Sequence, residues 1–164
     1  MSYPLFDRAC TIFCATDRPD RVLACVKATV PTLRITTKRG AITIKDADSV
    51  LVLTKTKFVR GGFKGPHGAF NRAVLGAATY FRRVRRPAAI RDRVVTQIAA
   101  TQLLIGCVAT PAFFAHDVVF AIARAMNGLV FDGQGMLDGG GKLVLDSKGR
   151  HDIQVFRGVT GRAD

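Results

Sequence analysis

The sequence predicts an α+β fold in which two similar βαβββ half-units form a mainly antiparallel sheet and are joined by an inserted helical segment. Three observations predict it: short apolar runs alternate with helical spacings, hairpin-type turns separate the later strands, and the same order of elements occurs twice. We expect the 164 residues to form a single domain. Its expected parts are a half-unit at 9–59, a basic loop and helices at 60–100, a half-unit at 102–146 and a loose tail at 157–164.

The first half-unit starts with an apolar run at residues 9–15, which is typical of a buried strand. A helix follows, because Pro19 suits a helix start, Val22 and Val26 share one face, and Pro31 ends the pattern. Turn residues at 38–40 and 46–49 then separate three runs with strand character. The predicted strands of this meander are 33–37, 41–45 and 50–59.

The inserted segment begins with a glycine-rich loop and continues as a helix from about His67 to Arg85. The helix is predicted because apolar residues recur at intervals of three and four, including Phe70 and Phe81. Pro87 marks its end. A second helix is indicated by a further apolar spacing, which consists of Ile90, Val94 and Ile98.

The second half-unit repeats the order of the first. An apolar strand is predicted at 103–108, and a helix starts at His116 and stops at Asn127 and Gly128. The strand sequences IFCAT and IGCVAT, at 12–16 and 105–110, share lettering apart from one inserted residue. An internal duplication and a coincidence between two apolar strands both explain this. The later predicted strands are 129–131, 135–137 and 142–145, with one more at 151–156.

Paired βαβββ units are the architecture of the vicinal-oxygen-chelate superfamily, metal enzymes related to glyoxalase, and the predicted order of elements resembles it. That resemblance implies His and Glu metal ligands on inward strand positions. This chain has no Glu, and its three histidines, His67, His116 and His151, fall at the starts of elements. The metal and the activity of that superfamily are therefore not expected here.

The chain carries 25 Lys and Arg residues against 12 acidic residues, a formal net charge of +13. Every acidic residue is Asp, so mechanisms that need paired glutamates are excluded. Such a surplus favours an acidic partner such as nucleic acid, while a role in solubility alone explains it equally well. Charge by itself leaves both interpretations open.

The first part of the candidate site is the glycine-rich loop before the inserted helix. Glycines let backbone N–H groups approach an anion closely, and a helix N-terminus adds partial positive charge. A connection that needs glycine for its φ angles explains the same residues without a ligand. The predicted anion-binding or nucleic-acid-binding residues here are Arg60, Gly62, Lys64, Gly65, His67 and Arg72.

The second part is an arginine cluster at the end of the same helix. Arginines there are also favoured by the helix dipole, by about 0.3–1 kcal/mol each. However, no acidic residue lies between Asp48 and Asp92 to compensate them. The loop and the cluster are separated by at most about 30 Å of helix, which suits a polyanion better than a small anion. The predicted residues are Arg82, Arg83, Arg85, Arg86, Arg91 and Arg93.

Other chemistry has little support. The Asp- and Gly-rich stretch 132–146 resembles calcium loops, but EF-hand spacing and its closing Glu are missing and β-turns explain it. Cys107 and His116 make the best Cys–His pair, yet Cys107 lies in a predicted buried strand, where thiols are inert. We therefore predict no catalytic residue, metal ligand or cofactor, and an enzyme is a third alternative that no motif supports.

The four cysteines form no C-x-x-C pair, which predicts buried, reduced thiols. The N-terminal residues lack a basic region and a cleavage pattern, and the longest weakly polar stretch, 98–111, is too short to span a bilayer. We expect no membrane span and a cytoplasmic location.

Two functions of different classes are predicted. The first is a non-enzymatic basic module that binds nucleic acid or another polyanion through residues 60–93. The alternative is an oligomeric structural or protein-interaction protein with an apolar interface, because a mean hydropathy of +0.19 beside so much charge implies more apolar residues than one small core uses. A homo-oligomer is the partner that this alternative implies.

Overall fold

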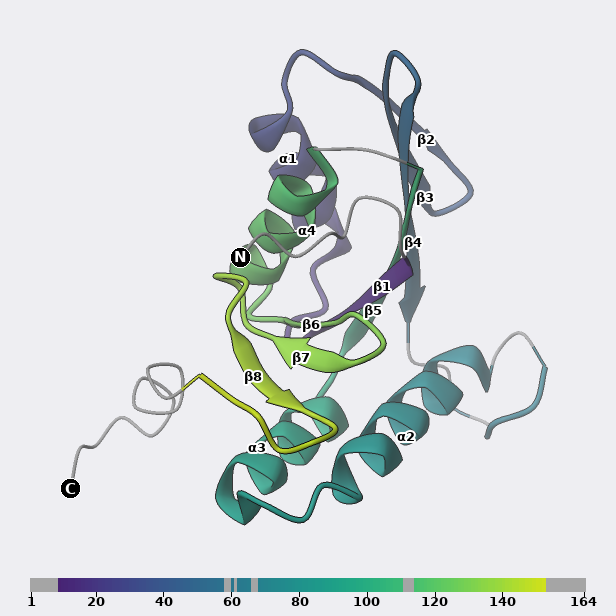
Figure 1. Ribbon diagram of the computed structural model, residues 1–164. Coiled ribbons are helices and arrows are strands. Elements are labelled where there is room, and N and C mark those ends of the chain that lie inside the picture. The colour runs from purple at the N-terminus through teal and green to yellow at the C-terminus, as the bar shows by residue number, and fades with distance from the viewer. Residues whose placement is uncertain (1–8, 58–59, 61, 66–67, 111–113, 153–164) are drawn as a thin grey trace.

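A computed structural model describes residues 9–57, 60, 62–65, 68–110 and 114–152 (Figure 1). The strands are β1 (Ala9–Cys14), β2 (Arg34–Lys38), β3 (Ala41–Asp46), β4 (Ser49–Lys57), β5 (Leu103–Thr110), β6 (Leu129–Phe131), β7 (Gly135–Leu137) and β8 (Leu143–Asp146). The helices are α1 (Pro19–Thr29), α2 (Ala69–Arg82), α3 (Ala88–Ala99) and α4 (Phe114–Ala125).

The strands form one sheet in the order β2-β3-β4-β5-β1-β6-β7-β8, and all neighbouring pairs are antiparallel. Two-residue hairpins set part of this order: Arg39 and Gly40, with φ of 50° and 80°, turn β2 into β3. The predicted α+β class with a mainly antiparallel sheet is confirmed.

Side chains of the central strands alternate between two cores, one on each face of the sheet. On β1, Cys10, Ile12 and Cys14 join the core beneath α1 and α4. Phe13 points the other way and joins the core beneath α2 and α3. Figure 1 shows these helix pairs as two separate packs, with α2 and α3 at the end of the sheet near β8.

The helices form where the apolar spacing places one face against the sheet. Val22 and Val26 are buried on α1, which has Pro in its first turn. The α2–α3 pair buries most of the predicted spacing, although Ala73 and Val74 are only half-buried. The following members are each less than a tenth exposed: Phe70, Ala77, Phe81, Ile90, Val94 and Ile98.

Most boundaries shift by one or two residues from the prediction, and three differences concern α2, α4 and the last predicted strand. Helix α2 ends at Arg82 rather than Arg85, because the Val84 N–H donates to the Phe81 carbonyl at 3.0 Å and the Val84 side chain enters the core. Helix α4 starts at Phe114 rather than His116, and its extra first turn packs Ala115 into the core.

The third difference concerns the last predicted strand. His151 and Asp152 are not in a strand, although the Asp152 N–H donates to the Leu143 carbonyl at 2.8 Å. The rest of that strand, 153–156, and the expected tail at 157–164 lie outside the described residues. Within the described chain, no helix is both long and apolar enough to cross a membrane.

The two halves share an order of elements, but their meanders join the sheet differently. The last strand of the first meander, β4, lies beside β5, whereas the first strand of the second meander, β6, lies beside β1. The strands β1 and β5 pair at the centre, with Ile12 opposite Ile105. The internal duplication therefore stays a prediction.

The described residues leave part of one sheet face exposed over β4 and β5. Leu51 and Leu53 of β4 point to the core beneath α1 and α4, so Val50 and Val52 point to the opposite side. Val52 pairs with Val108 of β5, which is 58% exposed. This open face is apolar at its centre.

Candidate anion-binding surface

The loop before α2 folds back over the first turn of that helix. Gly62 and Gly65 have φ of 102° and 70°, a region that favours glycine. A Cβ at Gly68 would lie 2.2 Å from the backbone carbonyl carbon of Phe63, so only glycine allows this approach. The predicted need for glycine φ angles is confirmed at two positions.

Two side chains of α2 bind the carbonyl groups of this loop. Asn71 Nδ2 donates to the Gly62 carbonyl at 2.9 Å. Arg72 Nη1 donates to the Phe63 carbonyl and, at 2.8 Å, to the Gly65 carbonyl. The loop therefore directs carbonyl oxygens toward the helix, and part of the Arg72 charge holds the loop in place.

The remaining predicted residues of the loop are the exposed side chains of Arg60 and Lys64. Helix α2 begins at Ala69, and its N-cap residue, Gly68, provides no side-chain cap. The predicted residue His67 lies outside the described residues.

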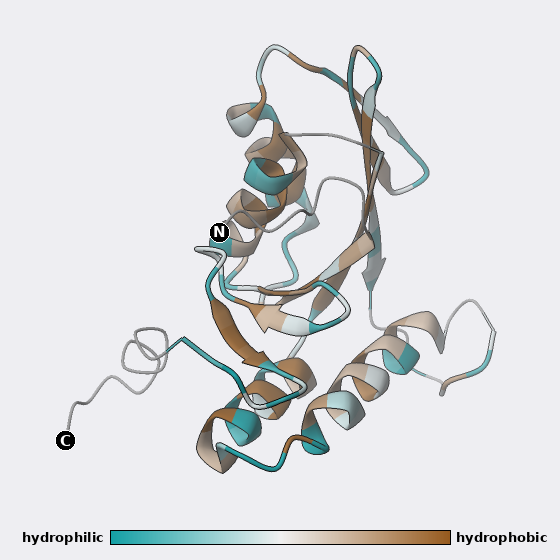
Figure 2. Ribbon diagram, in the orientation of Figure 1, coloured by the Kyte–Doolittle hydropathy of each residue, from teal (hydrophilic) through white to brown (hydrophobic). Residues whose placement is uncertain are grey.

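At the other end of α2, residues 83–87 form a short connector to α3. The arginines of this connector are exposed. Val84 is 3% exposed, whereas Arg83, Arg85 and Arg86 are all exposed. Figure 2 shows the connector as a mainly hydrophilic segment between two helices with apolar inner faces. Among the described residues, none of the ion pairs involves these three arginines.

Arg91 holds the connector rather than facing solvent freely. Its Nη1 donates to the Val84 carbonyl at 3.2 Å and to the Arg85 carbonyl at 3.5 Å, and its Nε pairs with Asp92 at 2.9 Å. Arg82 and Arg93, the other predicted members of the cluster, are exposed.

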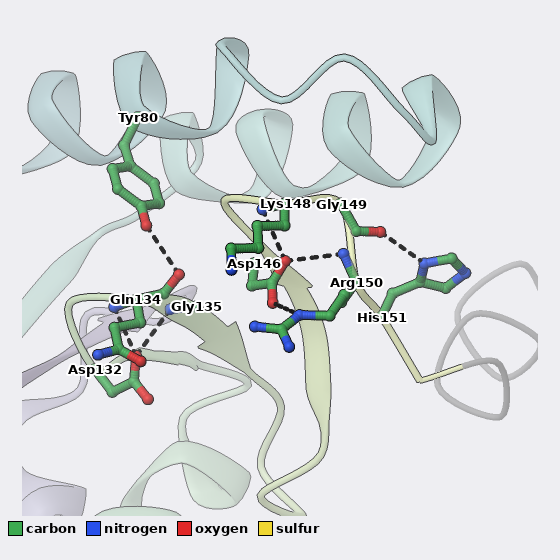
Figure 3. A network of polar contacts seen from close by, with 9 residues as sticks. All are labelled: Tyr80, Asp132, Gln134, Gly135, Asp146, Lys148, Gly149, Arg150 and His151. Carbon is green, nitrogen blue, oxygen red and sulfur yellow. Dashed lines mark hydrogen bonds and ion pairs between the residues drawn. The ribbon is translucent and has the colours of Figure 1, made fainter.

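The turn after β8 packs beneath this connector and is organised by Asp146 (Figure 3). Asp146 Oδ1 accepts hydrogen bonds from the backbone N–H groups of Lys148 and Arg150, at 2.9 and 2.8 Å. Its Oδ2 accepts one from Arg150 Nε at 2.6 Å. The carboxylate is 7% exposed, and its contacts fix the path of the turn.

Gly149 brings the turn into contact with the arginine connector. Its φ is 81°, and a Cβ built on it would lie 2.1 Å from the Arg86 carbonyl oxygen. A residue with a side chain would push the turn away from the connector. Glycine at this position therefore joins two segments that are far apart in the sequence.

This contact creates a cationic pocket of about 560 Å³, which we call the arginine pocket. Among the described residues, its lining contains four basic residues, one serine and no carboxylate. Sequence reasoning missed the two members from the β8 turn, because that stretch indicates a turn but not its position beside the connector. The lining residues are Arg83, Arg85, Arg86, Ser147 and Lys148.

A second hollow of about 470 Å³ runs along the outer face of α2, and we call it the α2 groove. Arg83 lines both hollows, so they are neighbours on the surface. Tyr80 forms a fixed wall, because its hydroxyl donates to the Gln134 carbonyl at 2.9 Å (Figure 3) and its ring packs edgewise on Phe81 and Phe131. The groove is lined by Phe63, Arg72, Leu75, Gly76, Thr79, Tyr80 and Arg83.

The contacts of Asp146 lower its pKa below the ordinary value for Asp. Burial acts in the opposite direction and raises the pKa, but the backbone and guanidinium hydrogen bonds from Arg150 and the amide of Lys148 outweigh it. Asp146 is thus a carboxylate at neutral pH, held within the turn.

Three of the four thiols are buried in the apolar core, as the sequence predicts. Cys10, Cys14 and Cys107 are buried and free, while Cys25 is half-buried. A hydrogen bond with Cys10, together with burial, raises the pKa of Cys107 well above its usual value, and burial raises the pKa of Cys14 to about 12. Such thiols stay protonated at neutral pH and are poor nucleophiles.

The Asp- and Gly-rich stretch forms turns, as the sequence indicates. Asp132 Oδ1 accepts hydrogen bonds from the N–H groups of Gln134 and Gly135, at 2.9 and 2.8 Å (Figure 3). Asp138 does the same for Gly140 and Lys142. In the part of the chain that the structure describes, no three His, Cys or Asp side chains gather closely enough to hold a metal ion.

Comparison of the chain with protein-family models, with curated proteins and with solved structures gave no match.

Proposed function

We propose that the protein binds nucleic acid or another polyanion, without catalysing a reaction, through the exposed basic residues of 60–93 together with the β8 turn. The arginine pocket carries this proposal, because four basic residues line it and no carboxylate does so in the part of the chain that the structure describes. Guanidinium groups bind phosphate oxygens in a bidentate manner, so phosphate is the anion that suits this lining best.

The extent of the basic surface favours a long anion over a small one. Helix α2 has 14 residues and is therefore about 21 Å long. Arg60 and Lys64 are exposed at one end, and the arginine pocket lies at the other. A polyanion reaches both ends, whereas a single phosphate occupies only the pocket.

The test measures the salt dependence of binding. Fluorescence anisotropy of a labelled single-stranded oligonucleotide is followed between about 50 and 200 mM salt. With about three phosphate contacts, the logarithm of affinity falls with the logarithm of salt with a slope of about −2. The triple variant Arg83→Gln, Arg85→Gln and Arg86→Gln binds at least about tenfold more weakly and shows a smaller slope.

A matched control removes three exposed charges from the region of α1, on the other face of the sheet: Arg18→Gln, Arg21→Gln and Lys27→Gln. The control retains most of the affinity if the arginine pocket is the site. Equal losses in both triple variants, or affinity that does not respond to salt, would contradict the proposal.

A second candidate function is favoured by the open sheet face. Val108 is 58% exposed at its centre and pairs with Val52, which pairs in turn with Thr43. Exposed apolar surface of this kind is typical of a protein interface. In this alternative the chain is an oligomeric interaction protein, and Val108→Lys lowers the mass measured by light scattering. A wild-type chain that stays monomeric at high concentration argues against it.

A further inference from the structure

We propose that the ligand of this surface is a single-stranded nucleic acid, with a base face lying in the α2 groove and its phosphates in the arginine pocket. This inference rests on the proposed function and adds the part of the ligand that carries no charge. The observations that point to it are the exposed apolar side chains of the groove, a glycine inside α2 around which the described residues leave open space, and Arg83, which lines both hollows.

The α2 groove exposes an aromatic ring and an aliphatic side chain. Among the described residues, the exposed large apolar side chains are Phe63, Leu75 and Val108, and the first two line this groove. Phe63 is 51% exposed and Leu75 is 48% exposed. Arg72 and Arg83 line the same groove, so apolar and cationic binding groups are available to the same ligand.

Gly76 is the second observation. It lies inside α2, is exposed and has no positive φ, and a Cβ built on it meets no atom within 4 Å. A helix is less stable with glycine in its interior than with alanine. Neither packing against the described residues nor backbone conformation therefore accounts for glycine at this position. It leaves a flat strip of helix surface beside Leu75, on which a planar ring can lie.

The charges at the ends of the groove indicate which planar ring this is. Arg72 lies toward one end and Arg83 lies at the other, and Arg83 is shared with the arginine pocket. A flat, uncharged ring linked to phosphate matches this arrangement, in which an apolar surface lies beside a cationic one. That combination is a nucleotide, whose base stacks on an aromatic or apolar surface while basic side chains bind its phosphates.

The groove also selects single strands over duplexes. A base exposes its face only when it is neither paired nor stacked in a double helix. A duplex presents phosphates to the arginine pocket but no base face to Phe63 and Gly76. Single-stranded and double-stranded oligonucleotides should therefore differ in how strongly they depend on the groove.

The experiment uses the full chain and three labelled or competing probes: a single-stranded oligonucleotide, a duplex of the same length, and inorganic polyphosphate, which has no bases. Gly76→Ala raises the melting temperature by about 2 °C, because alanine is the better helix former. The same change weakens single-strand binding by about fivefold or more, and Phe63→Ala does likewise. Both variants bind polyphosphate as the wild type does.

A Gly76→Ala variant that is more stable yet binds single strands more weakly cannot be explained by unfolding. Unchanged single-strand affinity in both variants, or an equal loss for polyphosphate, would overturn the inference while leaving the arginine pocket in place. A duplex that binds as tightly as the single strand would overturn it as well. A wild-type chain that binds none of the three probes removes the proposed function itself, and this inference with it.

Discussion

The N-terminal and C-terminal ends of α2 both carry a dense positive charge, but the residues around them use it differently. At the N-terminal end, Arg72 donates to two carbonyl groups of the glycine-rich loop. At the C-terminal end, Arg83, Arg85 and Arg86 line an open pocket together with a turn from β8. A glycine-rich loop thus identifies a segment that must bend, whereas the candidate anion site lies where basic residues from two segments meet.

The largest expected effect is on stability, and it comes from replacing either of two glycines with similar φ. Gly65 lies in the loop before α2, and Gly149 lies in the turn that packs on the connector after α2. Gly149→Ala should destabilise the protein by about 2–3 kcal/mol, because alanine disfavours φ of 81° and its Cβ collides with the Arg86 carbonyl oxygen. Gly65→Ala, at φ of 70° with no atom within 4 Å of its Cβ, should lose only about 1 kcal/mol. Denaturant unfolding measures both.

Equal losses of stability in these two variants would show that the β8 turn does not pack on the connector as described. Gly149→Ala should also weaken oligonucleotide binding, because it moves Lys148 out of the arginine pocket. Gly65→Ala should leave that affinity nearly unchanged.

The next largest effect is on the affinity for an oligonucleotide, when two positive charges are removed near one end of α2 or near the other. Arg85→Gln with Arg86→Gln should weaken oligonucleotide binding by about tenfold, or about 1.4 kcal/mol, because both side chains line the pocket. Arg60→Gln with Lys64→Gln should weaken it by less than about threefold. Anisotropy at one fixed salt concentration compares the two, and the reverse ranking would return the site to the glycine-rich loop.

A smaller effect is expected from the side chain that holds the loop. Arg72→Met keeps the apolar stem but removes the hydrogen bonds to the Phe63 and Gly65 carbonyls. Because these contacts are exposed to solvent, the loss of unfolding free energy should be about 0.5–1 kcal/mol. Arg82→Met, at an exposed position one residue before the connector, is the control. Faster amide exchange in residues 62–65 of the Arg72 variant alone would confirm the role of Arg72.

The smallest effect is confined to acid. The pKa of Asp146 is lower in the folded state than its usual unfolded value of about 3.9, so its carboxylate stabilises the fold above about pH 4. That contribution is lost as the pH falls through the lower, folded pKa. Asp146→Asn should flatten the dependence of unfolding free energy on pH below about pH 4, and an unchanged slope would count against the hydrogen bonds of Figure 3.

The parts of the fold that sequence predicts well are those set by local spacing. Most of the apolar positions that the spacing predicts for the inner faces of α2 and α3, from Phe70 to Ile98, are buried as their period of three and four indicates. The end of α2 at Arg82 was not predicted, because it depends on Val84 entering a core made by distant strands. How the meanders join the sheet is equally a matter of pairing over long distances.

The sequence predicts only part of the candidate site, because the rest again depends on contacts between distant segments. The arginines of the connector are recognisable as a cluster in the sequence, and the structure shows three of them lining one pocket. Lys148 lies some sixty residues later and has no local signal beyond the turn around it. Gly149 reads as an ordinary turn glycine, and only the Arg86 carbonyl oxygen beside it shows its role in assembling the pocket.

The assembly of the arginine pocket from two distant segments couples ligand binding to the integrity of the C-terminal edge of the sheet. Ser147 and Lys148 line the pocket only while the turn after β8 stays packed on the connector. By mass action, a ligand present at about a hundred times its dissociation constant would therefore favour the packed turn by about 2.7 kcal/mol. The bound polyanion would thus stabilise β8 and the turn that holds Ser147 and Lys148 against local opening.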